Sequence, residues 1–320
     1  MTRTLTAVLM GGTMIAGAAS AQQITFAHGA NEGNPRYAAA ERFAELAGEC
    51  EGITVSVAPS ATMGDDVEML TSTAGGVIQM TANSQGAMSQ IVPEVGALGL
   101  PFLFEDLPQA WEVLDGEVGE LIDERAQNAG LKVLGFWDNG IRHITHTGNF
   151  VETPADLEGV QIRTPPDEIR TAMFEALGAN PASLAWSELP TALQSGAFAA
   201  QENPLTNIYT ANLHEITPYI TLTAHAYEAT PVVASLVWWS GLDDTVQSCI
   251  QDAVDQSTTF QREMSQEQAE ALRATMEEEG AQFSEVEDRQ AFIDATSGVY
   301  NEVEERMPEI VSILRDATSQ

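Results

Sequence analysis

One stretch decides how this chain folds: Gly159–Pro204 reads GVQIRTPPDEIRTAMFEALGANPASLAWSELPTALQSGAFAAQENP. Arg163 stands inside an apolar, strand-like run at its start, and a helical pattern follows. Trp186 precedes a second helical segment, and Asn203 ends a second strand-like run. A cation, an aromatic ring and an amide therefore each lie at an edge of secondary structure. We expect them to converge on a small organic anion.

The remainder of the chain also alternates between strand and helix patterns. Gln23–Ala27 alternates like a strand, and Arg36–Glu49 carries apolar residues at helical spacing. This alternation predicts an α/β protein with mainly parallel sheets. Because ligands of such sheets bind outside the carboxyl ends of the strands, His28, Asn83 and the segment Asp138–Arg142 are candidate contacts.

The second half of the chain continues the pattern. A helix is expected over Trp111–Ala129 and a strand over Leu131–Phe136. Two further strands are expected over Leu222–Tyr227 and Val232–Trp239. A long helix is expected over Thr245–Glu279, ended by Gly280, and a final helical region over Phe292–Arg315.

The first residues are typical of a secretory signal. Arg3 supplies the charged region, an apolar run covers about Thr6–Ala18, and Ala19-Ser20-Ala21 matches a cleavage pattern. Cleavage after Ala21 would release an exported, periplasmic protein. A retained membrane anchor is the alternative, but the run is short and rich in glycine and threonine.

Charge and cysteine content limit the possible functions. The chain has 47 acidic and 13 basic residues and a formal net charge of −34, which excludes a nucleic-acid partner. Export permits a disulfide between Cys50 and Cys249, but two free thiols are equally compatible with the sequence. Two cysteines are too few for a disulfide framework or a zinc site.

No motif of catalysis or of cofactor binding was found. The sequence lacks a nucleophile elbow, a zinc-protease motif and a nucleotide-binding glycine loop, so we expect no catalytic residue and no cofactor. The histidines are not at metal-ligand spacing, so no metal is expected; they are His28, His143, His146, His214 and His225.

Motifs in the opening stretch resemble those of the solute-binding proteins of TRAP transporters, of the dicarboxylate-binding-protein type. The resemblance covers essentially the whole chain after the signal. The matching pieces within or beside the stretch are Asp156–Arg163, Ala176–Pro181, Glu188 with Thr191–Gly196, and Gln201–Pro204. The matching pieces before it are Tyr37–Glu41, Pro59-Ser60, Met63–Asp66 and Leu100–Phe104.

The resemblance implies a type II periplasmic-binding-protein fold, with two α/β lobes around a ligand cleft and a long C-terminal helix bridging them. We expect lobe I to comprise residues 22–147 plus 230–265, and lobe II residues 148–229 plus 266–320. The lobes would close over a small carboxylate-containing solute, an organic acid or a sugar acid. The partners implied are the membrane permease subunits of an ion-gradient-driven transporter, and the protein is expected to be a monomer.

The resemblance also assigns site residues. The carboxylate anchor falls on Arg163, the amide contact on Asn203 and the aromatic wall on Trp186. A second basic contact falls on Arg142, for which an ion pair between the lobes is the alternative. First-lobe contacts fall near His28, Asp66 and Asn83. Apart from the resemblance, Tyr227 is a candidate to line the cleft, on the strand that leads back to lobe I.

Two alternatives stay open. The first is a zwitterionic ligand, such as ectoine or an amino acid, which would suit the acidic surface. The second is a ligand-sensing module for a membrane receptor, which would share the fold and the site.

Overall fold

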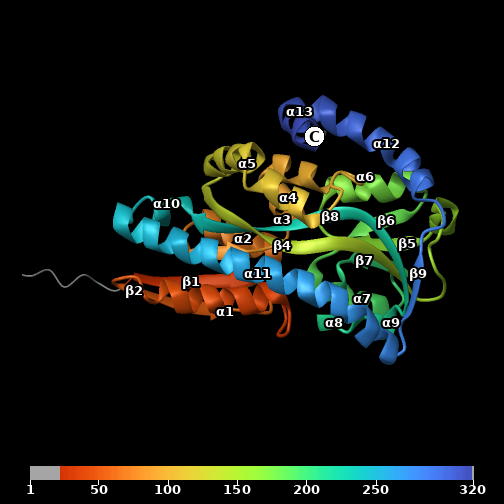
Figure 1. Ribbon diagram of the computed structural model, residues 1–320, viewed down its shortest axis with the longest axis horizontal. Coiled ribbons are helices and arrows are strands. Elements are labelled where there is room, and N and C mark those ends of the chain that lie inside the picture. Colours follow the sequence, from red (N-terminus) through yellow and green to blue (C-terminus); the bar gives the residue numbers. More distant parts are fainter. Residues whose placement is uncertain (1–21, 319–320) are drawn as a thin grey trace, which may run out of the picture.

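A computed structural model describes residues 22–318 (Figure 1). The predicted signal and its cleavage point fall within residues 1–21 and lie outside the described residues. Within residues 22–318, none of the helices is both long enough and apolar enough to cross a membrane.

A nine-stranded sheet runs through the molecule in the order β2-β1-β3-β8-β4-β7-β5-β6, with β9 beside β8. The strands at each end are parallel to their neighbours, whereas β3, β4, β7 and β8 pair antiparallel in the middle. The expectation of mainly parallel pairing therefore holds only for the ends. The strands are β1 (Gln22–His28), β2 (Ile53–Ala58), β3 (Met80–Ala82), β4 (Leu131–His146), β5 (Gln161–Thr164), β6 (Asn180–Ser183), β7 (Ala200–Asn203), β8 (Tyr219–Ser235) and β9 (Gln282–Glu285).

Helices cover the sheet at both ends and along its length (Figure 1). The α-helices are α1 (Pro35–Ala47), α2 (Asp66–Ala74), α3 (Gln85–Ser89), α4 (Leu107–Leu114), α5 (Glu117–Asn128), α6 (Glu168–Ala176), α7 (Leu189–Gln194), α8 (Leu205–Thr210), α9 (Leu213–Ile216), α10 (Leu236–Trp239), α11 (Asp244–Glu278), α12 (Arg289–Arg306) and α13 (Pro308–Thr318). Residues 22–318 also form three 3₁₀ helices, which are η1 (Pro93–Gly99), η2 (Pro154–Leu157) and η3 (Trp186–Glu188).

Two long strands, β4 and β8, join the two ends of the sheet. They pair with each other over most of their length, with register shifts on β4 between Val133 and Gly135, Asp138 and Gly140, and Arg142 and Ile144. Such bulges bend a strand and increase its local twist. The antiparallel pair β4–β8 is therefore the bent connection between the β1–β2–β3 end and the β5–β6–β7 end.

Several predicted boundaries were wrong. The strand predicted over Leu131–Phe136 continues to His146, and the two runs after Leu222 form the single strand β8. Pro231 interrupts the apolar pattern and favours a strand end in the sequence, although the strand passes through it. The run Val232–Trp239 is not all strand, because its last four residues form α10.

Two predicted helices are each divided in the structure. The helix expected over Trp111–Ala129 is α4 and α5, with a break at Asp115–Gly116. The final helical region is α12 and α13, and Pro308 begins the second of them. Proline suits the first position of a helix but cannot continue one, since it has no N–H to donate.

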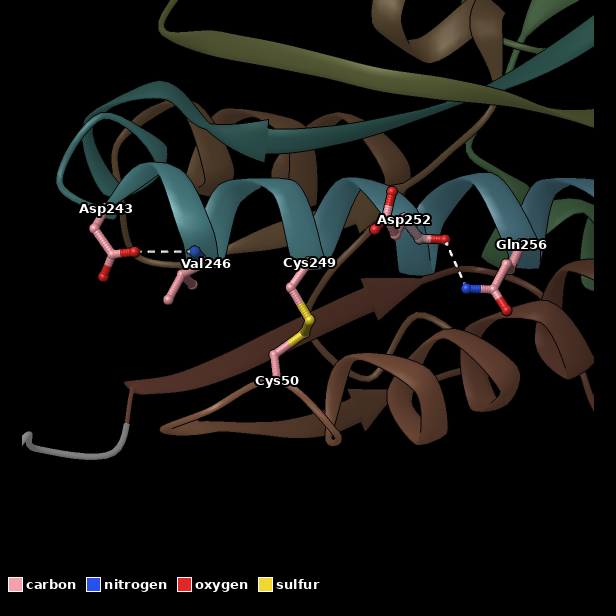
Figure 2. The surroundings of a disulfide bond; sticks show 6 residues. All are labelled: Cys50, Asp243, Val246, Cys249, Asp252 and Gln256. Carbon is pink, nitrogen blue, oxygen red and sulfur yellow. Dashed lines mark hydrogen bonds between the residues drawn. A yellow bond between two sulfur atoms is a disulfide. The ribbon is translucent and has the colours of Figure 1, made fainter.

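The long helix α11 spans both ends of the sheet. It packs on α1 and β4 near its start and on α8 and β9 further along (Figure 1). Cys50, in the turn between α1 and β2, forms a disulfide with Cys249 on α11 (Figure 2). The structure thus contains the bridge that the sequence left undecided, and it ties the β1–β2 end to the long helix.

Candidate functional site

A cavity of about 280 Å³ lies between the two ends of the sheet. Its walls come from the residues just after β1, from the start of α2, from β4, and from the carboxyl ends of β5, β6 and β7. This is the position at which open α/β sheets bind ligands. The cavity brings together residues from both ends of the chain's sheet.

Arg163 on β5 points a buried guanidinium into this cavity. The side chain is 2 % exposed, and its Nε and Nη2 both donate to the backbone carbonyl of Leu184, at 3.0 and 2.6 Å. Leu184 is itself fixed, because its N–H donates to the carbonyl of Thr164. Arg163 forms an ion pair with no carboxylate in residues 22–318, and its Nη1 donates to none of these residues. Its charge is therefore oriented by a neutral group and remains available.

The charge of Arg163 persists at neutral pH. Burial lowers the pKa of the guanidinium to about 10, and the nearby charges of Glu202, Arg142 and Asp66 act on it as well. The folded-state pKa is still far above 7, so the side chain is cationic in the physiological range. A buried, oriented cation of this kind can hold a carboxylate by charge-assisted hydrogen bonds.

Arg142 also lines the cavity, but its guanidinium is occupied. It forms ion pairs with Glu202 on β7 and Glu228 on β8. Burial by itself would raise the pKa of the Glu202 carboxyl, but the charges of Arg142 and Arg170 keep it below its usual range. The ion pair proposed as an alternative for Arg142 is present, and a contact with the ligand remains a prediction.

A chain of side-chain amides crosses the cavity. Asn34, the N-cap of α1, donates from Nδ2 to Oδ1 of Asn207 at 2.8 Å. Asn207 donates in turn to Asn139 on β4 at 3.0 Å and to Asn203 at the end of β7 at 3.2 Å. These bonds connect the β1 end to the β7 end directly, and they present a row of donors and acceptors to a polar ligand.

Trp186 and Asp66 both lie beside Gly29. A Cβ atom built on Gly29 would lie 2.7 Å from Oδ1 of Asp66 and 3.8 Å from Cδ1 of Trp186. Asp66 is the first residue of α2, and its Oδ2 accepts from the N–H of Ser84 at 3.3 Å. Trp186 begins η3 and is half-buried. The missing side chain at Gly29 therefore makes room for the carboxylate, with the indole beside it.

The family model for bacterial extracellular solute-binding protein, family 7, matches residues 26–306. The chain belongs to this family. The predicted dicarboxylate-binding-protein type of TRAP solute-binding protein is thereby confirmed, as is its fold class.

Three similar proteins each match most of this chain. Protein y4mM of Sinorhizobium fredii is 42% identical over 90% of this chain, although the match spans only 53% of that relative. The 2,3-diketo-L-gulonate-binding periplasmic protein YiaO of Escherichia coli is 31% identical over 86% of this chain and 85% of its own length. A TRAP periplasmic solute-binding protein from Roseobacter denitrificans, solved with β-D-glucuronate, superposes with a TM-score of 0.89. It is 26% identical and covers 92% of this chain and 99% of its own.

Of the site residues that the sequence analysis named individually, five line the cavity. They are Arg163, Arg142, Asn203, Trp186 and Asp66. The sequence pattern placed them at strand ends and helix starts, where their side chains can reach a common space.

Three other candidates are buried but do not line the cavity. His28 is fully buried, and its Nδ1 accepts from the N–H of Ala30. Asn83 bonds to Thr81 and lies against Asp66. Tyr227 is buried on β8, where its ring packs edge-on against Phe104. None of the three is among the lining residues, so their direct contact with a ligand remains an untested prediction.

Sequence reasoning missed Arg36, which lines the cavity from the first turn of α1. Its side chain is 6 % exposed, and its Nη2 donates to Oδ1 of Asn139 at 2.9 Å. A cation is unfavourable in the first turn of a helix because it faces the positive end of the helix dipole. This unfavourable position just after the first strand was the sequence feature from which Arg36 could have been predicted as a site residue.

Proposed function

We propose that this chain is the exported solute-binding subunit of a TRAP transporter and that its cavity captures a small carboxylate-containing solute. The observation that carries the proposal is Arg163, a buried cation oriented by the Leu184 carbonyl and paired with no carboxylate of the described chain. Isolated buried charges are unfavourable, so a ligand anion would supply the missing partner.

The arginine alone does not account for a useful affinity. Hydrogen bonds to charged groups contribute about 1.5–3 kcal/mol each. Micromolar binding needs about 8.2 kcal/mol. Asn203 as a polar clamp, Trp186 as an apolar wall and closure of the cleft supply the remainder, with Arg142 as a second basic contact.

The names of the relatives support a hydroxylated or keto acid. One relative is named for 2,3-diketo-L-gulonate, and a solved one holds β-D-glucuronate. Both ligands combine one carboxylate with several oxygen substituents. We infer that the solute of this chain is an organic acid or a sugar acid of similar size.

Capture would proceed by closure of two lobes, residues 22–147 plus 230–265 and residues 148–229 plus 266–320. The bent pair β4–β8 provides the connection about which they move. The Asn34–Asn207 bond and a bond from Asn31 Nδ2 to the carbonyl of Thr210, at 3.4 Å, span the two sides and would break on opening. Such closure removes water and strengthens the charge-assisted bonds inside.

The closed, loaded protein would deliver its ligand to the membrane permease subunits, which use an ion gradient. We propose that it acts as a monomer in the periplasm after cleavage behind Ala21. It would bind and release its ligand unchanged, as a transport protein and not as an enzyme.

A thermal-shift comparison of matched solutes tests this function. D-Galactonate and galactitol share a carbon skeleton, but only the first has a carboxylate. We expect organic and sugar acids to raise the melting temperature and polyols to leave it unchanged. A ligand at 100 times its Kd adds about 2.7 kcal/mol to the stability of the native state. Stabilisation by the neutral polyols alone would contradict the proposal.

A further inference from the structure

Other charged side chains line the same cavity as Arg163. Arg142 is neutralised by Glu202 and Glu228, so it offers little net charge. Arg36 on α1 and Asp66 on α2 both line the cavity. These two side chains supply one cation and one anion.

Arg36 has donors to spare. Its Nη2 bonds to the neutral amide of Asn139, its Nε is buried without a partner, and its Nη1 donates to no residue within 22–318. No ion pair within residues 22–318 neutralises it. A buried donor without an acceptor costs about 1–3 kcal/mol. A ligand oxygen that accepts from Nη1 would give the guanidinium a further partner.

Asp66 supplies the complementary acceptor. Its carboxylate is held toward the cavity by the N–H of Ser84 and fits against Gly29. Burial lowers the pKa of Arg36, and the charge of Asp66 acts in the opposite direction. The Asn34–Asn207–Asn139 amides lie beside them.

This combination suits hydroxyl groups better than a second carboxylate. A hydroxyl both donates and accepts, so it can donate to Asp66 while it accepts from Arg36. A second ligand carboxylate can only accept, and its charge would face the like charge of Asp66. Arg36 and Asp66 together therefore favour a hydroxyl group over a second carboxylate.

Building on the function proposed above, we propose that Arg36 and Asp66 are specificity-determining residues that read the hydroxyl groups of a polyhydroxylated monocarboxylate. Arg163 holds its single carboxylate. The ligand class is that of aldonates and uronates, and dicarboxylates of the same length are disfavoured by Asp66.

Calorimetry with matched acids tests this proposal. The probes are three pairs, gluconate with glucarate, galactonate with galactarate, and mannonate with mannarate, together with succinate. Within each pair only C6 differs, as a hydroxymethyl group or a carboxylate. For the tightest pair we expect the monocarboxylate to bind about tenfold more tightly or better.

Two variants identify the residues responsible. Asp66→Asn keeps the shape of the side chain and removes its negative charge. It should therefore lower the ratio of monocarboxylate to dicarboxylate affinity by about tenfold. Its control is Asp244→Asn, which alters the same first position of another helix, α11, at an exposed site. Arg36→Gln should weaken monocarboxylate binding by about tenfold or more. Its control is Arg42→Gln, on the exposed face of the same helix, where Arg42 pairs with Glu45.

The outcomes separate the two proposals. A wild-type protein that binds the diacids or succinate as tightly as the aldonates overturns the inference and leaves carboxylate capture intact. Unchanged selectivity in Asp66→Asn, or unchanged affinity in a folded Arg36→Gln protein, overturns it as well. If none of the acids binds, the proposed function itself fails.

Discussion

At the scale of single residues, two equally buried arginines in one cavity differ in their bonding partners. Arg142 and Arg163 are each 2 % exposed. The first is bound by two glutamates, and the second only by the carbonyl of Leu184. Because their partners differ while their burial does not, we propose Arg163 rather than Arg142 as the anchor for an incoming anion.

Locating the edges of secondary structure was enough to select several residues of the cavity wall. Arg163 and Asn203 lie near strand ends and Trp186 begins η3, and all three line the cavity, while their contact with a ligand is still a prediction. The partners of Arg142 could not be predicted, because Glu228 lies on a strand more than 80 residues further along the chain. Arg36 was not predicted, because the partner that holds its side chain in the cavity wall, Asn139, lies more than 100 residues further along the chain.

Gly29 offers a test at this scale. In Gly29→Ala the new Cβ would lie 2.7 Å from Oδ1 of Asp66, so the carboxylate must move. Loss of one well-placed hydrogen bond to a charged group costs about 1.5–3 kcal/mol. We expect sugar-acid affinity, measured by calorimetry, to fall about tenfold or more.

The control for Gly29→Ala is Gly298→Ala on α12. An added Cβ there meets no atom within 4 Å, and alanine is the better helix former. This variant should bind normally and melt no lower than the wild type. Unchanged affinity in Gly29→Ala would remove Asp66 from the binding site.

At the scale of elements, β4 and β8 set the geometry of the site. They carry Arg142, Asn139 and Glu228, and they connect the two ends of the sheet. The sequence predicted only the first part of β4, because Gly135, Gly140 and polar residues beyond Phe136 obscure the alternation. Gly140 has φ +118°, a conformation that favours glycine, and a Cβ there would lie 3.1 Å from Pro204.

The disulfide between the α1–β2 turn and α11 gives the prediction at this scale (Figure 2). It closes a loop with a sequence separation of 199 residues. Removing a native disulfide typically costs about 2–5 kcal/mol, mainly through the entropy of the unfolded chain. We expect the double variant Cys50→Ser/Cys249→Ser to lose stability of this order in urea unfolding.

Ligand binding separates this effect from damage to the site. Neither cysteine lines the cavity, so the affinity of the double variant should stay within about twofold of the wild type. A reductant should destabilise the wild type similarly and leave the double variant unaffected. Equal stability of the two proteins would show that the bridge contributes nothing.

At the scale of the whole molecule, the sequence predicted layers but not one continuous sheet. Parallel pairing at the ends follows from local strand–helix alternation. The antiparallel centre depends on β4 meeting β8, and no local pattern encodes a pairing between segments so far apart. The predicted bridging helix is α11, recognisable because its apolar period continues for 35 residues before Gly280.

The net charge of −34 also acts on the whole molecule. It should repel an anionic solute at long range. Salt limits that field to about 10 Å at 0.1 M, so repulsion would chiefly slow association at low ionic strength. Inside the cavity, the nearby Arg163 and Arg36 outweigh the distant surface charge.

Titration calorimetry of Arg163→Ala with the tightest acid of the panel tests the central claim most directly. Two charge-assisted bonds of about 1.5–3 kcal/mol each correspond to a loss of about 100-fold or more. Arg306→Ala, which removes an exposed arginine that pairs with Glu168, should bind normally. We predict no measurable binding by a folded Arg163→Ala protein, whereas near-native affinity in that variant would contradict carboxylate capture by Arg163.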